Sequence, residues 1–339
     1  MARMFKVSSS PHIRDDTDIP RIMYSVVAAL IPALVGAVYF FGIPALIVTA
    51  LCVVTCVATE GIIERLAGKP LTITDGSAIV TGVLLAFNLP SEVPWWIAVI
   101  GGFFAIAVGK MTFGGLGFNP MNPALLARVF LLISWPVSMT TWPAPRGIDA
   151  ETVATPLAVL KQNTMILLNR EANSIEDVNR ALSVINDLSD SHANLFFGNV
   201  GGCLGETSVL LLLIGAAFLM YKRYIGWRVP LSYIATVGVL TWIIGGAEGL
   251  FTGPWLFHIL SGGLILGAFF MATDMVTSPI TFTGRIIFGV GCGVITTVIR
   301  LWGGYPEGVS FSIILMNLTV PLIDRYTRPK VFGKAAKQG

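Results

Sequence analysis

The sequence predicts an all-α integral membrane protein with about ten transmembrane helices in two inverted five-helix repeats, separated by a large periplasmic loop between helices 5 and 6. Of its 339 residues, 54% are hydrophobic and 12% are charged, and the mean hydropathy is +0.77. Soluble domains carry about a quarter charged residues. Apolar runs recur from Ile22 onward, and one polar stretch, residues 139–203, interrupts them. Together these features indicate a membrane protein with one functional loop.

Most of the candidate spans are close to the ~20 residues that a helix needs to cross the hydrocarbon, and only the third is short. Five precede the polar loop and five follow it. We expect the first to stay in the membrane, because no small-residue cleavage site follows it. The candidate spans are about 22–40, 44–66, 76–89, 94–111, 121–137, 204–221, 229–246, 255–272, 285–301 and 309–325.

The Lys and Arg residues predict the orientation. The three short turns near Gly42, Glu92 and Glu248 carry no Lys or Arg, whereas the alternate segments and both tails do. Short cytoplasmic loops concentrate basic residues, so both termini are expected in the cytoplasm of a bacterial inner-membrane protein. The predicted parts are an N-terminal tail (1–21), a first repeat (22–138), a periplasmic loop (139–203), a second repeat (204–325) and a basic tail (326–339).

An internal repeat is suggested by two pairs of segments. Residues 80–85 resemble residues 260–265, and residues 114–119 resemble residues 303–308, each of the latter pair preceding an apolar span. Five spans per copy is an odd number, so the second copy would be inverted, as in many transporters. The alternative is chance similarity between glycine-rich membrane segments.

Glycine and asparagine cluster before the fifth span. Unwound backbone at membrane depth is tolerated where it lines a cavity, so this segment could present carbonyls and amides to a ligand. The alternative is a cytoplasmic loop that leads into a helix, with an asparagine as N-cap before Pro123. The candidate residues are Gly114, Gly115, Leu116, Gly117, Asn119 and Asn122.

Few charges fall inside the spans. Arg128, in the fifth span, could hold an anionic phosphate or pair with an acid of another subunit. Glu60, Asp75 and Asp274 could be cation ligands, or they could be interfacial or paired charges. The four cysteines are too scattered for a disulfide framework or a metal cluster, and we expect them to be small buried hydrophobes.

Three segments carry a resemblance to a known family: Ser8–His12, Thr74–Ala78 and, above all, Gly114–Ala124, which reads GGLGFNPMNPA. Across the whole chain the sequence resembles the NqrB/RnfD family of membrane subunits, and most closely the RnfD subunits of Rnf electron-transport complexes. The resemblance implies a membrane subunit that takes part in electron transfer between reduced ferredoxin and NAD, coupled to Na⁺ or H⁺ export.

The resemblance also implies covalent FMN, joined by a phosphoester to a threonine and attached by a periplasmic flavin transferase. The family's attachment pattern falls on residues 149–155, so Thr155 is the expected acceptor, and Val153 stands where the family usually has Gly. Without the family, Thr155 would be a helix N-cap before Pro156. Flavins supply the one- and two-electron chemistry that side chains lack.

A second flavin, noncovalent riboflavin, is implied in the membrane part, and its expected environment is Asn88 with the 114–122 segment. Arg128 could hold a flavin phosphate. The expected partners are the RnfA, RnfB, RnfC, RnfE and RnfG subunits and the lipid bilayer, with no nucleic acid. Iron–sulfur centres would lie in partners, because this chain has no cysteine cluster. The competing hypotheses are a channel for a small neutral solute and a scaffold subunit without a cofactor.

Overall fold

The computed structural model describes residues 17–143, 145, 154–168, 174–190, 192–206, 208–246, 249–305 and 307–328. Within these ranges every extended regular element is helical, which confirms the predicted all-α class. The attachment pattern upstream of Ala154, including Val153, lies outside the described residues, as do both expected tails for most of their length. The main helices of the N-terminal half are α1 (Ile19–Phe41), α2 (Ile43–Leu66), α3 (Ser77–Phe87), α4 (Trp95–Ala107) and α5 (Pro123–Ser134).

Helices also fill the connection and the C-terminal half. The connection holds α6 (Pro136–Met139), α7 (Pro156–Leu168), α8 (Ile175–Asp190) and α9 (His192–Phe197), so it is largely helical in its described part. The C-terminal half holds α10 (Val209–Tyr221), α11 (Arg228–Ile244), α12 (Trp255–Leu260), α13 (Leu264–Leu266), α14 (Phe282–Trp302) and α15 (Val309–Tyr326).

Four described helical stretches are long and apolar enough to cross a membrane: α1, α2, residues 95–113 and α14. Shorter apolar helices include α3, α5, α10 and α11. On α1, Ile31, Val35 and Tyr39 are 51%, 62% and 64% exposed. Large side chains of this kind cost free energy in water and suit contact with lipid. The helices therefore have the properties of a membrane protein.

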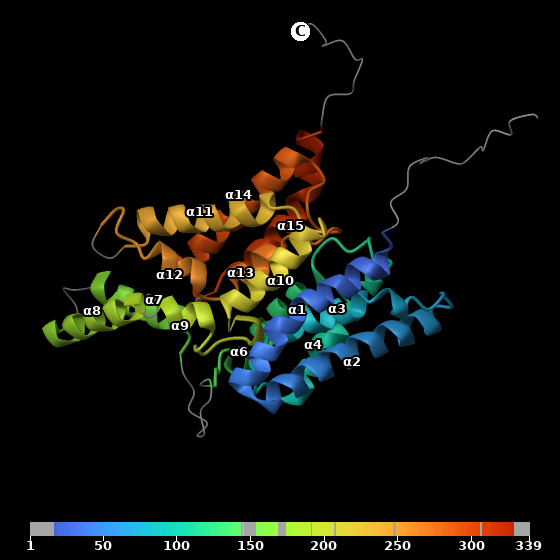
Figure 1. Cartoon of the computed structure of the whole chain (residues 1–339), viewed down its shortest axis with the longest axis horizontal. Coiled ribbons are helices and arrows are strands. Elements are labelled where there is room, and N and C mark those ends of the chain that lie inside the picture. The colour runs from blue at the N-terminus through green and yellow to red at the C-terminus, as the bar shows by residue number, and fades with distance from the viewer. Residues whose placement is uncertain are drawn as a thin grey trace, which may run out of the picture.

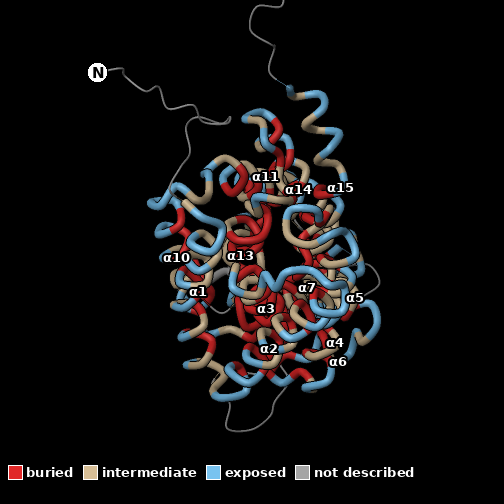
Figure 2. The backbone as a smooth tube through the Cα atoms, turned by 90° about the vertical axis from the view of Figure 1, so that its right-hand side faces the viewer, coloured by how far each residue is buried: buried red, intermediate tan, exposed pale blue. Residues whose placement is uncertain are grey.

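The two shortest helices of the interior are the most enclosed. Figure 2 shows α3 and α13 among the buried parts of the backbone, with exposed surface on the outer helices. A close approach makes this possible at Gly82, where an added Cβ would lie 2.6 Å from Val53 Cα on α2. A larger residue would push α3 off α2, so glycine is required at this crossing.

The span expected at 255–272 is broken. The chain leaves α12 at Leu260, turns through Gly262 at φ +68°, and re-enters α13 and a π-helical turn, Gly267–Met271. A Cβ on Gly262 would lie 2.7 Å from the Leu157 side chain of α7 and 3.2 Å from Arg300 Nη2. The break is therefore the place where the connection between the halves reaches the membrane helices, and a sequence count of apolar residues does not detect it.

The two halves use the same scheme of neighbours. α2 packs on α4 as α11 packs on α14, and α4 packs on α5 as α14 packs on α15. The halves meet through α1 with α10 and through α5 with α15. Asn122, at the start of α5, donates its backbone N–H to the Asn317 side chain of α15 at 3.1 Å. α5 therefore lies where the two halves join.

Helices α7, α8 and α9 lie together on one side of the molecule, next to α12 (Figure 1). Leu157, Leu160 and Leu195 form an apolar cluster with Phe257 of α12. The Lys161 ammonium donates to the carbonyl oxygens of Ile299, Gly303 and Tyr305 at the end of α14. A cation at a helix C-terminus is electrostatically favourable, so these contacts fix α7 on the C-terminal half.

Candidate functional site

Thr155 caps the N-terminus of α7. Its Oγ1 accepts a hydrogen bond from the Ala158 N–H at 3.2 Å, and its carbonyl accepts from the Val159 N–H at 3.0 Å. The residue is 3% exposed, yet it forms part of the wall of a cavity. The N-terminus of a helix favours negative charge, because its first N–H groups and its dipole point outward. The Thr155 hydroxyl therefore lies where an attached anionic group would be stabilised.

The outer cavity, as we call this space, has a volume of about 240 Å³. Elements of both halves and of the connection surround it. Aromatic rings and one cation stand out in its wall, and the Arg128 Cζ lies 5.8 Å from the Trp142 ring centroid. The lining residues are Arg128, Leu132, Thr140, Trp142, Ala154, Thr155, Ala158, Tyr305 and Glu307.

Arg128 projects from α5 into this cavity and is 3% exposed. Its Nη2 lies 3.6 Å from Glu307 Oε2, a long ion pair, and its Nη1 finds no hydrogen-bond partner in the described part of the chain. A buried guanidinium with an unused donor is unfavourable unless a further acceptor binds there. The orphaned donor beside Thr155 fits an anionic group such as a phosphate, which arginine binds with charge-assisted hydrogen bonds.

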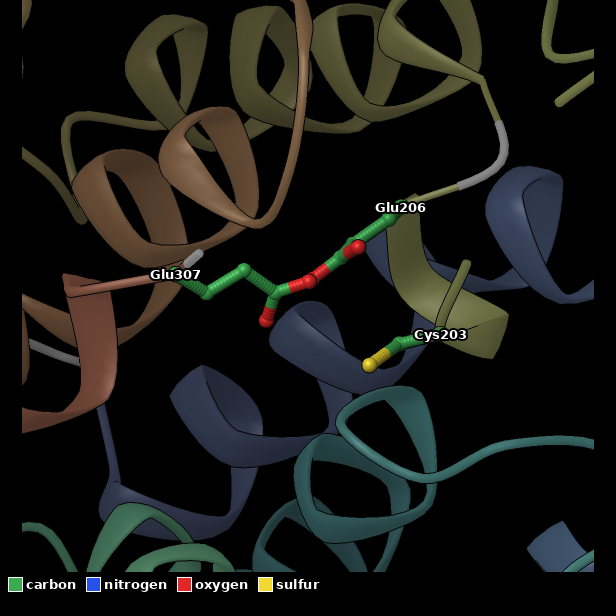
Figure 3. Close-up of side chains that lie close together, drawn as sticks. All are labelled: Cys203, Glu206 and Glu307. Carbon is green, nitrogen blue, oxygen red and sulfur yellow. The ribbon is translucent and has the colours of Figure 1, made fainter. Parts of the chain in front are cut away.

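Three further polar side chains meet at the edge of the outer cavity: Cys203, Glu206 and Glu307 (Figure 3). Their Sγ and carboxylate oxygens lie within 4.8 Å of one another. The Cys203 thiol donates to the Asn88 carbonyl at 3.4 Å. Burial and the neighbouring Glu307 carboxyl raise the pKa of Glu206, against the opposing effect of the Arg128 charge.

A second cavity, the inner cavity, lies at the other end of α5 and has a volume of about 100 Å³. Hydroxyl and amide groups of both halves face it among apolar side chains. Its polar lining residues are Ser77, Thr81, Lys110, Asn119, Asn122, Tyr224, Thr273 and Asp274. Asn122 serves α5 as well, because its Oδ1 accepts from the N–H groups of Ala124 and Leu125. The capping alternative and the cavity-lining hypothesis therefore both describe this residue.

The charges of the inner cavity are paired. The Lys110 ammonium donates to Glu60 Oε1 at 2.5 Å and to Ser77 Oγ at 2.6 Å. Lys110 and Glu60 are 2% and 1% exposed, so this is a fully buried ion pair. Asp274 accepts from the Thr277 hydroxyl at 3.0 Å. The cavity thus presents neutral hydrogen-bonding groups rather than an unused charge.

The structure divides the predicted site residues between the cavities. Leu116, Asn119 and Asn122 line the inner cavity, whereas Arg128 and Thr155 line the outer one. Asn88 lies in neither wall. It follows α3, and its side-chain amide donates to the Leu84 carbonyl at 2.7 Å.

The three glycines of the same segment form its turn. Gly114, Gly115 and Gly117 have φ of 120°, 108° and 93°, and none of them lines the inner cavity. Residues with a side chain rarely adopt such angles. These glycines therefore shape the loop that presents Leu116 and Asn119. Asp75, another sequence candidate, accepts from the Ser77 N–H at 2.8 Å and acts as a local cap.

Four residues of the outer cavity or its edge were missed from the sequence: Trp142, Glu206, Tyr305 and Glu307. Tyr305 and Glu307 fall in the 303–308 segment, which the repeat comparison had singled out, and Glu206 directly follows a glycine-rich run. The signal was present, but only the fold brings Glu206 next to Glu307.

With this geometry in view, sequence comparison decides the family. Residues 6–333 match the model of the NQR2, RnfD, RnfE family. The chain belongs to the NQR2, RnfD, RnfE family. The resemblance predicted from the Gly114–Ala124 motif is therefore confirmed.

Relatives that are named as members of redox complexes cover nearly the whole chain. An RnfD-type subunit of the proton-translocating ferredoxin:NAD(+) oxidoreductase complex of Clostridium ljungdahlii is 48% identical over 332 residues, which is 97% of this chain and 96% of the relative. The corresponding subunit of the Na(+)-translocating complex of Acetobacterium woodii is 49% identical over 329 residues, 96% and 95%. That of the ion-translocating oxidoreductase complex of Stutzerimonas stutzeri is 43% identical over 346 residues, 96% and 94%. These relatives support the predicted role as a redox subunit.

Proposed function

We propose that this chain is the RnfD subunit of an ion-translocating ferredoxin:NAD(+) oxidoreductase, with FMN joined covalently to Thr155 and riboflavin bound noncovalently in the inner cavity. The observation that carries the proposal is the unpartnered Nη1 of Arg128 in the cavity wall that also contains Thr155. The relatives are subunits of such complexes and match along nearly their whole length. The expected partners are the RnfA, RnfB, RnfC, RnfE and RnfG subunits.

The residues around Thr155 suit a phosphoester. Its Oγ1 acts as a hydrogen-bond acceptor in the cap of α7, and an ester oxygen at that position remains an acceptor. The phosphate would lie at the N-terminus of α7 and within the reach of the Arg128 guanidinium, which offers an unused donor. Trp142 and Tyr305 supply aromatic walls. When bound, FMN supplies the one- and two-electron chemistry that this chain lacks.

The residues of the inner cavity suit a flavin without a phosphate. Asn119, Asn122 and Thr81 offer neutral donors and acceptors, while Lys110 is occupied by Glu60 and Ser77. Riboflavin carries no phosphate and needs no free cation. Asn122 and Arg128 lie six residues apart on α5, so the two cavities are separated by roughly 9 Å along the helix axis. One short helix would thus hold residues of both flavin sites.

The architecture we propose is the one expected from the sequence, two inverted five-helix repeats with both termini cytoplasmic and Thr155 on the outer face of a bacterial inner membrane. The matching neighbour schemes of the two halves support the repeat, and the distribution of Lys and Arg supports the orientation. A channel for a neutral solute is disfavoured, because such a channel has no use for the free Arg128 donor. Relatives of nearly equal identity name different ions, so overall identity does not select Na⁺ or H⁺.

Flavin fluorescence of the denatured protein on a gel tests the proposal. The chain is produced together with an active flavin transferase, and Thr155→Ala is compared with Thr164→Ala on the same helix. We expect a fluorescent band for wild type and Thr164→Ala and a dark band for Thr155→Ala. A dark wild-type band would overturn the covalent cofactor, and a fluorescent Thr155→Ala band would place the attachment elsewhere. Flavin released by mild denaturation of the dark variant reports the noncovalent site separately.

A further inference from the structure

Glu206 and Glu307 lie at the edge of the outer cavity with their carboxyl groups turned toward each other (Figure 3). The two groups share a hydrogen bond. An ionised carboxylate can only accept hydrogen bonds, so a bond between two carboxyl groups requires a proton on one of them. Glycine makes the geometry possible, because a Cβ on Gly263 would lie 3.1 Å from Glu206 Oε1 and one on Gly202 would lie 3.1 Å from its Oε2.

Charged and titratable groups approach the pair from several elements. Arg128 of α5 lies 3.6 Å from Glu307, and the Arg300 charge of α14 acts on both carboxyl groups. Arg300 itself donates to the carbonyls of His258 and Ser261. On the pair's own connection the Cys203 thiol donates to Asn88 and stays neutral. Tyr305 lines the same cavity, and His258 approaches Arg300 rather than the acids.

We propose that Glu206 and Glu307 form a proton-exchange site of the outer cavity, which holds one shared proton at neutral pH and takes up a second when the cavity gains a negative charge. The source of that charge rests on the proposed function, namely a reducible flavin phosphoester on Thr155. With one shared proton the pair carries one negative charge and the two arginines carry two positive charges. A phosphodiester on Thr155 brings the sum to neutral.

The coupled step balances simply. One electron reaches the cofactor from the electron carriers of the complex, one O–H bond forms on Glu206 or Glu307, and the surrounding water gives up that proton. Water can reach the pair because the Glu307 side chain is 18% exposed. Reoxidation reverses the transfer. Compensation by a proton is favoured because an unbalanced charge in a poorly solvated cavity is costly.

A bound divalent cation is the competing use of Cys203, Glu206 and Glu307, since their ligand atoms are close enough to share one. The Arg128 guanidinium beside Glu307 opposes it, because a metal ion would repel this charge at short distance. The hydrogen bond between the two carboxyl groups opposes it as well, since a metal would displace the shared proton. Both observations favour a proton over a cation.

Infrared spectroscopy of the full chain in detergent tests the pair without any need for a flavin. We expect a protonated carboxylic acid carbonyl band at neutral pH, sensitive to D₂O, in both wild type and Thr155→Ala. The band should be lost in Glu206→Gln and in Glu307→Gln. It should shift in Gly263→Ala, which displaces the Glu206 carboxyl without removing it. A spectrum unchanged by these substitutions overturns the proposal, as does loss of the band when Mg²⁺ or Zn²⁺ is added.

A redox titration of the covalent flavin in the assembled complex tests the coupling. In wild type we expect the reduction equilibrium to change tenfold for each pH unit, about 59 mV for a one-electron couple. In Glu206→Gln the dependence should be nearly flat. The same slope in both proteins overturns the coupling. Absence of a covalent flavin in wild type would instead overturn the proposed function, while the infrared result would still decide the proton-sharing pair.

Discussion

In the inner cavity the Lys110 ammonium is paired with Glu60 at 2.5 Å, whereas in the outer cavity the Arg128 guanidinium lies 3.6 Å from Glu307 and keeps one donor free. Both cations are buried, and both face a cavity beside α5. The inner charge is satisfied within the protein, and the outer one is left for something else. Because burying an unsatisfied charge is costly, this difference indicates which cavity receives an anionic ligand.

The comparison relates each cavity to the charge of its proposed cofactor. A phosphoester on Thr155 is anionic and meets a free guanidinium and the N-terminus of α7. A flavin without a phosphate is neutral and meets amides and hydroxyls. Variants that remove the charged group of one cavity should therefore affect the two sites differently, and the largest effect is expected where an existing pair is broken.

Lys110→Ala should lower the free energy of unfolding by about 3–5 kcal/mol, because it leaves the Glu60 carboxylate buried without its partner. Thermal or denaturant unfolding of the detergent-solubilised chain measures the loss. Lys69→Ala is the control, since Lys69 is exposed and should change stability by no more than about 0.5 kcal/mol. In the double variant Lys110→Met with Glu60→Gln most of the stability should return, as the two effects are not additive. Full loss in the double variant would contradict the ion-pair interpretation.

Arg128→Gln should lower the fraction of chain that carries covalent flavin by tenfold or more, because a charge-assisted hydrogen bond contributes about 1.5–3 kcal/mol. Noncovalent flavin should be unchanged. Quantitative in-gel fluorescence, normalised to protein, measures the covalent part, and flavin released on denaturation measures the other. Arg128→Lys is the matched control and should retain an intermediate level, since lysine keeps the charge but loses the fork geometry. Equal loss of both flavins in Arg128→Gln would indicate general unfolding instead.

Much of the fold follows from apolar periodicity. Helices lie at each of the expected spans, and α1, α2 and α14 match their predicted ends to within a few residues. The break at Ser261–Gly263 could not be predicted from hydropathy, because its cause is the approach of Leu157 from a distant segment. Likewise, the polar connection has no apolar run to reveal α7, which is held by contacts with α12 and α14.

The candidate site was predictable where one residue serves one local element. Asn122 and Thr155 both precede a proline at the start of a helix, so capping could be read from the sequence. The division of Asn122 and Arg128 between two cavities could not, although they share α5. Nor could the meeting of Glu206 with Glu307, because their approach depends on how α10, α13 and α15 are placed.

Asn122→Ala should remove the cap of α5 and lower the free energy of unfolding by about 1 kcal/mol. It should also release the noncovalent flavin and leave the covalent one in place. Ser208→Ala is a matched control, because Ser208 caps α10 through the Leu211 N–H and does not line the inner cavity. A similar loss of stability without loss of flavin is expected there. If both variants lose the noncovalent flavin, the inner cavity is not its site.

Thr155→Ser is expected to have the smallest effect. Serine keeps both the acceptor that caps α7 and the hydroxyl that would form the phosphoester, so stability should change by no more than about 0.5 kcal/mol. Thr155→Val keeps the shape but loses the hydroxyl. It should be destabilised by about 1 kcal/mol and carry no covalent flavin. Unfolding measurements and in-gel fluorescence on both variants separate the two roles of this side chain. A serine variant that is stable but dark would show that the attachment reaction requires the threonine methyl group as well, while the cap requires only the oxygen.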